Sequence, residues 1–429
     1  MTNWKRSLLV CSIVLIAATA LAQTPIVPPD SVITSYTLPP DKLAKATALY
    51  DVRVKLLIAD TIFGFVLLLA FVYGRVGARF RSMAEGVTSG IKKQGLVAIP
   101  LFLLVMTVCQ LPLEMYGHRL QLAYGLSVQH WGSWFGDWLK SLAISLLIGT
   151  AAISGAYALM RKFARNWWLV FWAISVPFLI FFIFLVPFVI DPLFNHFDPL
   201  APRQPQLVAE IEKVVQHGGL SIPRDRMFEM RASEKVTTLN AYVTGLGASK
   251  RVVVWDNTIK EMTVPQTLFV FGHEMGHYVL NHMWKGLAFF FVLLFVAYWF
   301  GARVGEWSVR RFGARWDIRA LSDYASLPLL ILIISVFMFI TQPITSGFSR
   351  YLEHQADQYG MEVTHGIVPN VNQNAAQTFQ ALGENGLSYP NPAPWLIFWT
   401  YDHPAIPDRV QFVLHYNPWA EGKQGEFVK

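Results

Sequence analysis

The chain has very little cysteine. Of its 429 residues only Cys11 and Cys109 are cysteines, and both lie inside apolar stretches. Two such residues cannot build a disulfide framework or supply the thiolates of a cysteine-rich structural zinc site. Any metal that this chain binds must therefore take nitrogen and oxygen ligands.

Charge is also scarce. Asp, Glu, Lys and Arg make up 15% of the residues, hydrophobic residues make up 54%, and the mean hydropathy is +0.38. An ordinary soluble domain carries about 25% charged residues, so this composition is typical of a membrane protein. The formal net charge of +7 does not indicate a nucleic-acid partner, because the basic residues cluster between apolar runs and no nucleic-acid-binding motif occurs.

The N-terminus carries a short apolar run, Leu8–Ala22, after a basic start. Its length and its Ala-Leu-Ala close are typical of a cleavable bacterial signal peptide, and an uncleaved first membrane helix is the alternative. Residues 23–53 are expected to form a linker, which is extended over the Pro-, Ser- and Thr-rich stretch Thr24–Pro40.

Six further apolar runs are each long enough to cross a bilayer core, which needs about 20 residues. With the first run they predict a mostly helical membrane protein of about seven spans, with membrane helices in residues 54–190 and 284–347. The six runs are Val54–Tyr73, Leu96–Met115, Trp138–Met160, Trp167–Ile190, Trp284–Ala302 and Ala325–Gly347.

Lys and Arg are unevenly shared among the short loops. Three loops are basic, within residues 75–93, 161–165 and 303–319, whereas the loop Tyr116–Asp137 holds only Arg119. By the positive-inside rule the three basic loops are cytoplasmic. The two long polar segments, 191–283 and 348–429, then share the opposite face, which in a bacterial inner membrane is the periplasm.

The most informative motif is FGHEMGHYVLNH at Phe271–His282, which contains His-Glu-x-x-His. On a helix His273 and His277 are one turn apart on one face and can hold a single Zn²⁺ ion, with Glu274 beside the metal's water. Thr263-Val264-Pro265-Gln266 predicts a capping box at the start of this helix, whose end runs into the apolar run at Trp284.

A catalytic zinc site needs a third protein ligand and keeps one position open for water. Glu353 and Asp357 are four residues apart in a helical segment after the last apolar run. One can therefore bind the metal while the other orients it or a histidine. A solvent-exposed helix carboxylate is the alternative for Glu353.

Such a site supports metal-assisted peptide hydrolysis. Zinc activates its water and polarises the scissile carbonyl, and Glu274 takes the water's proton and passes it to the leaving amine. A structural zinc would be closed by four ligands and would not need Glu274. A membrane chaperone or transporter with a structural zinc site is the alternative function.

Two further stretches suggest substrate contacts. Thr238–Thr244 and Arg251–Trp255 predict a β-hairpin, whose edge either pairs with an extended peptide or only braces the zinc helix. His403 and Arg409 are possible donors to the oxyanion. The sequence alone favours an ordinary loop histidine at 403, and likewise at His282 and His354.

The chain resembles the type I CAAX prenyl proteases, the seven-span membrane zinc metalloendopeptidases, over roughly residues 50 to 415. The motifs keep the family's order. They are Leu111–Leu113 with Tyr124-Gly125, Asp191–Asn195 with Asp198–Leu200, Asn240–Tyr242 with Gly245, the zinc helix, Ser349-Arg350 with Glu353 and Gln355–Asp357, and His403-Pro404 with Arg409.

The resemblance implies that Glu353 is the third zinc ligand and that Asp357 is an outer partner or proton donor. It also implies that Asn240 and Ala241 lie on the substrate-binding edge and that His403 and Arg409 lie near the transition state. The implied fold is a ring of membrane helices around a chamber, with an α+β zinc-protease domain built from the loop between spans 5 and 6 and the C-terminal tail.

We therefore expect a zinc metalloendopeptidase of the bacterial inner membrane, with one Zn²⁺ ion. Its partners would be the lipid bilayer and membrane-associated, lipid-modified or misfolded protein substrates. True processing of prenylated CAAX tails is the second possibility, because prenylated proteins are not expected in a bacterium. The sequence does not indicate an oligomeric state.

Overall fold

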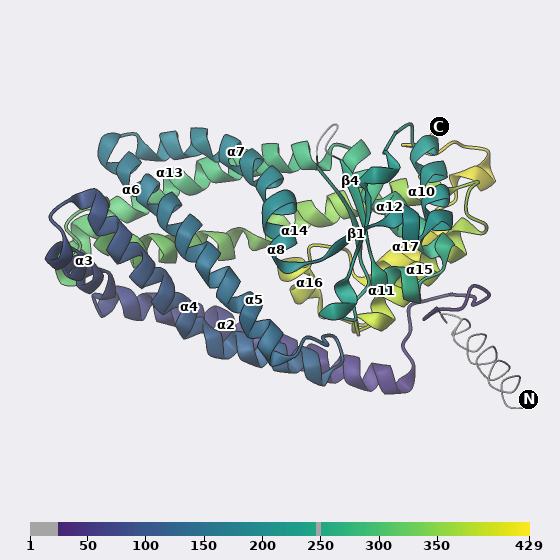
Figure 1. Ribbon diagram of the computed structural model, residues 1–429, viewed down its shortest axis with the longest axis horizontal. Helices are drawn as coiled ribbons and strands as arrows, with labels where there is room; N and C mark the ends of the chain where they lie inside the picture. Colours follow the sequence, from purple (N-terminus) through teal and green to yellow (C-terminus); the bar gives the residue numbers. More distant parts are fainter. Residues whose placement is uncertain (1–24, 246–249) are drawn as a thin grey trace, which may run out of the picture.

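The computed structural model describes residues 25–245 and 250–429, so the run Leu8–Ala22 lies outside the described residues. Long helices lie side by side over most of the molecule, and a small sheet with shorter helices forms the other part (Figure 1). We call this second part the polar domain. It contains β1–β4, α8–α12 and α15–α17.

Six helices in the described part are long and apolar enough to cross a membrane, and each contains one of the predicted apolar runs. The prediction of these spans is therefore confirmed. The first three are α2 (Pro40–Tyr73), α4 (Ile91–Ala123), and α5 with α6 (Trp131–Ile144 and Thr150–Lys162, joined by a π-helical turn). The fourth is α7 (Trp167–Leu185), which continues through a π-helical turn to Phe194, and the fifth is α13 (His282–Trp316). The sixth is α14 (Leu327–Thr364) with the short 3-10 turn Tyr324–Ser326 before it.

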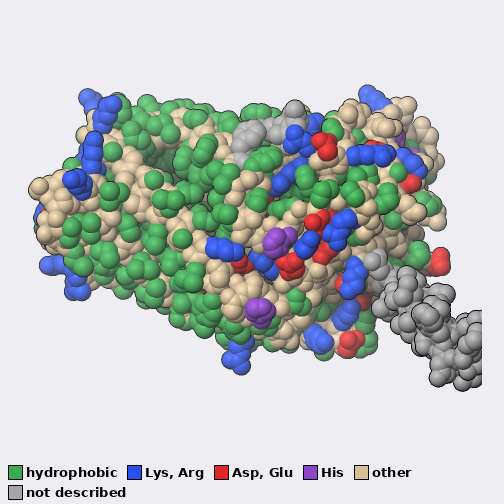
Figure 2. Space-filling model, viewed as in Figure 1, with side chains coloured by type: hydrophobic (Ala, Val, Ile, Leu, Met, Phe, Trp, Pro, Cys, Tyr) green, Lys and Arg blue, Asp and Glu red, His purple; other side chains and the backbone are tan. Residues whose placement is uncertain are grey.

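Neighbouring spans touch through aromatic pairs. Phe65 of α2 packs on Phe339 of α14, and Trp172 of α7 stacks on Phe291 of α13. Even so, only 6 to 39% of the most apolar window of each span is buried within the protein. Most apolar side chains of the spans therefore face away from their neighbours, and Figure 2 shows them covering this part of the surface.

The three basic loops meet at one end of the bundle. Arg81 in α3 (Val76–Val87) is 3% exposed and binds Asp317 and Asp323, at 3.0 and 2.7 Å. Arg161 donates to the backbone oxygen of Ser322 at 3.1 Å. In Figure 1 this end, marked by α3, is opposite to the polar domain. The predicted grouping of the basic loops on one side is thus confirmed.

The predicted linker over residues 23–53 is wrong in its second half. Helix α2 begins at Pro40, and residues 40–53 are its first turns. Proline is favoured at the first position of a helix because its missing N–H has no helical partner there. Pro40 was read as part of an extended stretch, whereas it marks the start of the span.

The first half of this segment is extended but is bound to the polar domain. Gln373 of α15 (Val371–Asn385) accepts from the backbone N–H of Ile33 at 2.8 Å and donates to its carbonyl at 3.0 Å. Gln380 makes the same pair of bonds with Thr37, at 3.3 and 2.5 Å. These side chains pair with an extended backbone much as a neighbouring strand would.

A four-stranded sheet forms the centre of the polar domain, with the order β1-β2-β4-β3. The predicted hairpin is confirmed, because β3 and β4 are antiparallel with Ala241 opposite Val254. Strand β3 is at the edge of the sheet, so its outer side pairs with no other strand among the described residues, and an edge of this kind can bind another chain. The strands are β1 (Phe197–Pro199), β2 (Met227–Met230), β3 (Ala241–Thr244) and β4 (Arg251–Trp255).

The sheet packs against helices through an apolar core that includes Val252 and Val254, which are fully buried. This domain is therefore α+β, as predicted. Its helices are α8 (Asp191–Phe194), α9 (Leu200–Arg203), α10 (Pro205–His217), α11 (Asp256–Glu261), α12 (Val264–Val279), α15, α16 (Pro394–Thr400) and α17 (Ile406–His415).

Helix α12 carries the His-Glu-x-x-His motif. The predicted capping box is present, with Thr263 and Gln266 bound to each other's backbone N–H groups. The helix does not run on into the next span, contrary to the prediction. It ends at Val279, and Asn281 takes a left-handed conformation (φ 58°) before α13 begins at His282. Asn tolerates this conformation better than most residues.

Candidate active site

Two helices that cross at close range bring the site together. A Cβ atom on Gly276 of α12 would lie 3.0 Å from the Cβ of Tyr359 on α14, and one on Gly360 would lie 3.1 Å from the backbone nitrogen of His273. Contacts of this length are tighter than nearly all real contacts of a Cβ atom, so a larger residue would push the two helices apart by a few tenths of an ångström. These two glycines therefore allow the histidines of α12 to reach the carboxylates of α14.

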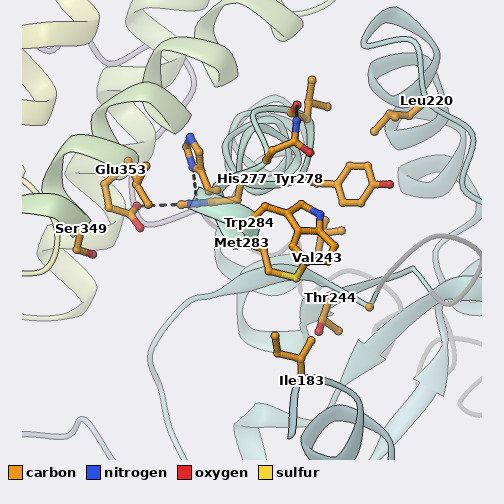
Figure 3. Close-up of a pocket in the computed structure, with 15 residues that line it drawn as sticks. Ile183, Leu220, Val243, Thr244, His277, Tyr278, Met283, Trp284, Ser349 and Glu353 are labelled. Carbon is orange, nitrogen blue, oxygen red and sulfur yellow. Dashed lines mark hydrogen bonds and ion pairs between the residues drawn. The ribbon is translucent and has the colours of Figure 1, made fainter. Parts of the chain in front are cut away.

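The three predicted metal ligands converge on one point. Nε2 of His273 lies 3.2 Å from Nε2 of His277 and 3.2 Å from Oε2 of Glu353, and His277 Nε2 is 3.5 Å from the same oxygen. Figure 3 shows His277 and Glu353 pointing toward each other from their two helices. In the described part of the chain they form a group of three possible ligands.

These side chains fit a zinc ion. Ligand atoms at about 2.0–2.2 Å from tetrahedral zinc lie about 3.3–3.5 Å from one another, close to the separations found here. Oε2 of Glu353 is buried without a hydrogen bond of good geometry from any described residue. A cation between the two imidazoles would supply its missing partner. Two imidazoles and one carboxylate are also ligands that zinc accepts.

Glu274 follows the first ligand on α12 and is only partly exposed. Burial raises the pKa of its carboxyl group, and the nearby His273 and His277 act in the opposite direction. No described side chain donates a hydrogen bond to Glu274 or pairs with it as an ion. Its carboxylate is thus free to accept a proton from a molecule bound at the site.

Asp357 and Arg409 lie next to His273, the first predicted ligand, on the side of its Nδ1 atom. The Nδ1 of His273 lies 2.8 Å from Oδ1 of Asp357, which is 1% exposed. Arg409 of α17 donates to both oxygens of this carboxylate, at 2.9 and 2.6 Å. Both side chains are buried and bind each other, and Asp357 contacts the ring nitrogen of His273 that faces away from His277 and Glu353.

His403 lies at the rim of the site, 3.2 Å from Glu353 Oε2 through its Nε2. It is therefore not a remote loop histidine. Its other ring nitrogen is 2.9 Å from Asp402 Oδ1, and this hydrogen bond holds the pKa of the Asp402 carboxyl below its usual value. Sequence reasoning missed Asp402, although it directly precedes His403 in the chain.

A cavity of about 790 Å³ opens beside the metal ligands. His277 and Glu353 line it together with Val243 and Thr244 of the edge strand (Figure 3). The rest of its wall is mostly apolar. Further lining residues include Ile183, Leu220, Val279, Met283, Trp284 and Leu352.

The two predicted substrate-binding residues, Asn240 and Ala241, do not line this cavity, although they lie at the start of the strand that borders it. Ala241 is the first residue of β3 and is 2% exposed. Asn240 is exposed, and its backbone N–H and carbonyl both bind the hydroxyl of Thr258, at 2.8 and 2.7 Å. Val243 and Thr244, later in the same strand, reach the cavity. Sequence reasoning found the strand but missed these positions.

A second cavity, of about 530 Å³, has His403 and Arg409 in its wall, together with Tyr50 and Arg53 of α2. His403 also contacts Glu353, so this cavity adjoins the site. Both cavities are bordered by a membrane span.

The chain matches two family models. Residues 201–417 match peptidase family M48, and residues 18–196 match the N-terminal region of CAAX prenyl proteases, described as five membrane helices. The first match contains both ligand-bearing helices, and the second ends where the polar domain begins.

Curated relatives and a solved structure agree with these matches. The chain is 36% identical over 343 residues to the uncharacterized metalloprotease YhfN of Bacillus subtilis, covering 77% of this chain and 78% of that protein. It is 25% identical over 334 residues to CAAX prenyl protease 1 of Saccharomyces cerevisiae, covering 74% and 71%. The crystal structure of S. mikatae Ste24p has a similar fold, with a TM-score of 0.75, 22% identity, and coverage of 88% of this chain and 89% of that one.

Proposed function

The chain belongs to peptidase family M48 and is a membrane metalloendopeptidase related to the CAAX prenyl proteases, and from this premise we propose that it is a zinc enzyme. The convergence of His273, His277 and Glu353 on one point carries the proposal. These three residues would hold one Zn²⁺ ion, and segments 191–283 and 348–429 would form the catalytic unit. A structural zinc in a chaperone or transporter is not favoured, because a closed site would need a fourth protein ligand.

Bound zinc would supply a Lewis acid that polarises the scissile carbonyl and makes water acidic. Glu274 accepts the proton of the attacking water and returns it to the leaving amine. The absence of a hydrogen-bond partner for Glu274 among the described side chains supports this role. Burial supports it too, because a raised pKa lets the carboxyl group hold the proton until the amine takes it.

His403 is proposed as the donor to the developing oxyanion. Its position 3.2 Å from Glu353 Oε2 and its hydrogen bond with Asp402 support this role. We propose that Asp357 positions His273 and does not act as a proton donor. Arg409 is proposed to fix Asp357 and not to contact the reacting atoms, because two of its nitrogens bind that carboxylate.

An extended substrate is proposed to pair with the free edge of β3. The strand lies at the sheet edge, and Val243 and Thr244 line the same cavity as the ligands. Pairing of this kind fixes a peptide backbone regardless of its sequence. At the start of the strand, Asn240 would contact the substrate through its exposed side chain, and Ala241 through its backbone, because its side chain is buried.

We propose that the substrates are membrane-associated, lipid-modified or misfolded proteins. The mostly apolar wall of the larger cavity and its border on α7 and α13 support a hydrophobic substrate reaching the site from the bilayer side. Processing of prenylated CAAX tails, the activity in the names of several relatives, is the second candidate. The same apolar wall is compatible with a prenyl chain.

Removing the metal tests the proposed activity. Chelation of the purified protein in lipid should stop cleavage of an unfolded membrane-protein substrate, and stoichiometric Zn²⁺ should restore it. Peptide products would be measured by mass spectrometry. Cleavage that continues in protein shown to be metal-free would contradict the proposal.

We also propose that the protein lies in the inner membrane with the polar domain in the periplasm. The grouping of Arg81, Arg161 and other basic residues at the far end of the bundle supports this orientation. Single cysteines would be introduced as Lys213→Cys in the polar domain and Arg79→Cys at the basic end, after replacing Cys11 and Cys109.

A membrane-impermeant maleimide should label Lys213→Cys in cells with a permeable outer membrane. Arg79→Cys should react only after the inner membrane is opened. Both positions are exposed in the structure, so lack of access must come from the membrane. The reverse labelling pattern would place the polar domain in the cytoplasm.

A further inference from the structure

The two histidine ligands present the same nitrogen to the metal. Nε2 of each ring faces the shared point with Glu353, so Nδ1 of each ring faces outward. For His273 the outer partner is Asp357, at 2.8 Å. For His277 the outer neighbour is Nδ1 of His282, at 3.0 Å. The two ligands thus have comparable outer contacts, one from a carboxylate and one from a third imidazole.

His282 is held firmly in this place. It is the first residue of α13, directly after the left-handed turn at Asn281, and it is 4% exposed. Its ring meets that of His277 nearly at a right angle, with centroids 5.0 Å apart and an angle of 79° between the planes. An edge-to-face arrangement lets a ring N–H of one imidazole point at a ring nitrogen of the other.

The roles of the four ring nitrogens follow from the chemistry of imidazole. A neutral imidazole carries hydrogen on one nitrogen only, so a His277 that binds a cation through Nε2 carries its hydrogen on Nδ1. That N–H is the donor in the contact with His282. Nδ1 of His282 is then the acceptor, and its hydrogen must lie on its own Nε2.

The other ring nitrogen of His282 does not explain why a histidine is found here. Nε2 is buried and makes no hydrogen bond of good geometry among the described residues, although the side chain of Gln355 lies near the ring. A buried polar atom without a hydrogen bond lowers the stability of a fold by roughly 1–3 kcal/mol. The presence of a histidine at position 282 therefore needs an explanation. The contact of Nδ1 with the metal ligand provides one.

We propose that His282 is a positioning residue for the metal site, which fixes the tautomer and ring orientation of His277. The proposal rests on the proposed function, because it assumes a metal at the three ligands. Its consequence is that the first residue of a membrane span acts on the metal through a ligand of the polar domain.

The test compares the zinc affinity of two variants of the full-length protein, measured by competition with a chelator of known affinity. His282→Ala removes the acceptor and should weaken zinc binding about 10–100-fold, the usual effect of losing an outer partner. His282→Asn keeps an acceptor oxygen near the position of Nδ1 and should recover most of the affinity. His354→Ala is the matched control, because His354 adjoins Glu353 but packs against Phe412, with ring centroids 4.3 Å apart and the rings tilted by 58°.

Two further readouts separate positioning from stability. The thermal unfolding of the metal-free His282→Ala protein should match that of the unsubstituted protein. The visible spectrum of bound Co²⁺ should change in His282→Ala and not in His354→Ala, because it reports ligand geometry. Zinc affinity within twofold of the unsubstituted protein, or a loss that Asn does not restore, would overturn the role of His282. An unsubstituted protein that binds no zinc would overturn the proposed function as well.

Discussion

Replacing Glu274 by Gln should lower proteolytic turnover by about 10²–10⁴-fold while the metal stays bound. Gln has nearly the same shape as Glu but cannot accept a proton from water. The proposed ligands His273 and His277 share one face of α12 and are unchanged in this variant, so the metal site should persist. Turnover on a quenched peptide and metal content by mass spectrometry would be measured on the same preparation.

A control with the same chemical change should leave turnover intact. Glu421 is exposed and, among the described residues, forms an ion pair with Lys423 alone, at 2.6 Å, so Glu421→Gln removes a carboxylate that does not line the site. Turnover in Glu274→Gln that stays within tenfold of the unsubstituted protein would exclude this residue as the base. Loss of metal in that variant would instead reveal an effect on the ligands.

Replacing Glu353 by Gln should abolish both metal binding and activity. The substitution removes the one negatively charged ligand, and a neutral amide oxygen is a much weaker partner for Zn²⁺. We expect the loss of zinc affinity to exceed the roughly 100-fold that removal of an outer partner costs. Metal content after gel filtration and zinc affinity by chelator competition would both be measured.

The neighbouring residue provides the control for this change. His354 follows Glu353 directly but faces Phe412, so His354→Ala should keep the metal and the activity. Full zinc occupancy in Glu353→Gln would show that the third ligand is another residue. The separations of 3.2 and 3.5 Å to the two histidines make Glu353 the expected one.

Much of this architecture could be predicted from the sequence because the signals are local. An apolar run of bilayer length, a capping box at Thr263 and alternating residues around Ala241 each depend on near neighbours in the chain. The pairing of His273 and His277 could be predicted for the same reason, since a spacing of four places them on one helical face. The roles of Glu353 and Asp357 came from the family resemblance, because spacing alone left two alternatives.

The features that sequence reasoning missed depend on contacts between distant segments. His282 contacts His277 only because the chain turns at Asn281. The left-handed conformation of a single residue cannot be predicted from the periodicity of the sequence. Val243 and Thr244 reach the cavity because of where the sheet lies against α12. Pro40 was assigned to a linker because the same residue favours both extended segments and helix starts.

The proposed ligands are also made at different times during synthesis. His273 and His277 leave the ribosome before α13, whereas Glu353 lies in the second half of α14. With this proposed ligand set, the metal centre cannot form until α14 has been made and inserted. We therefore expect the nascent chain to lack hydrolytic capacity throughout its insertion, and a fragment that ends before α14 to remain inert.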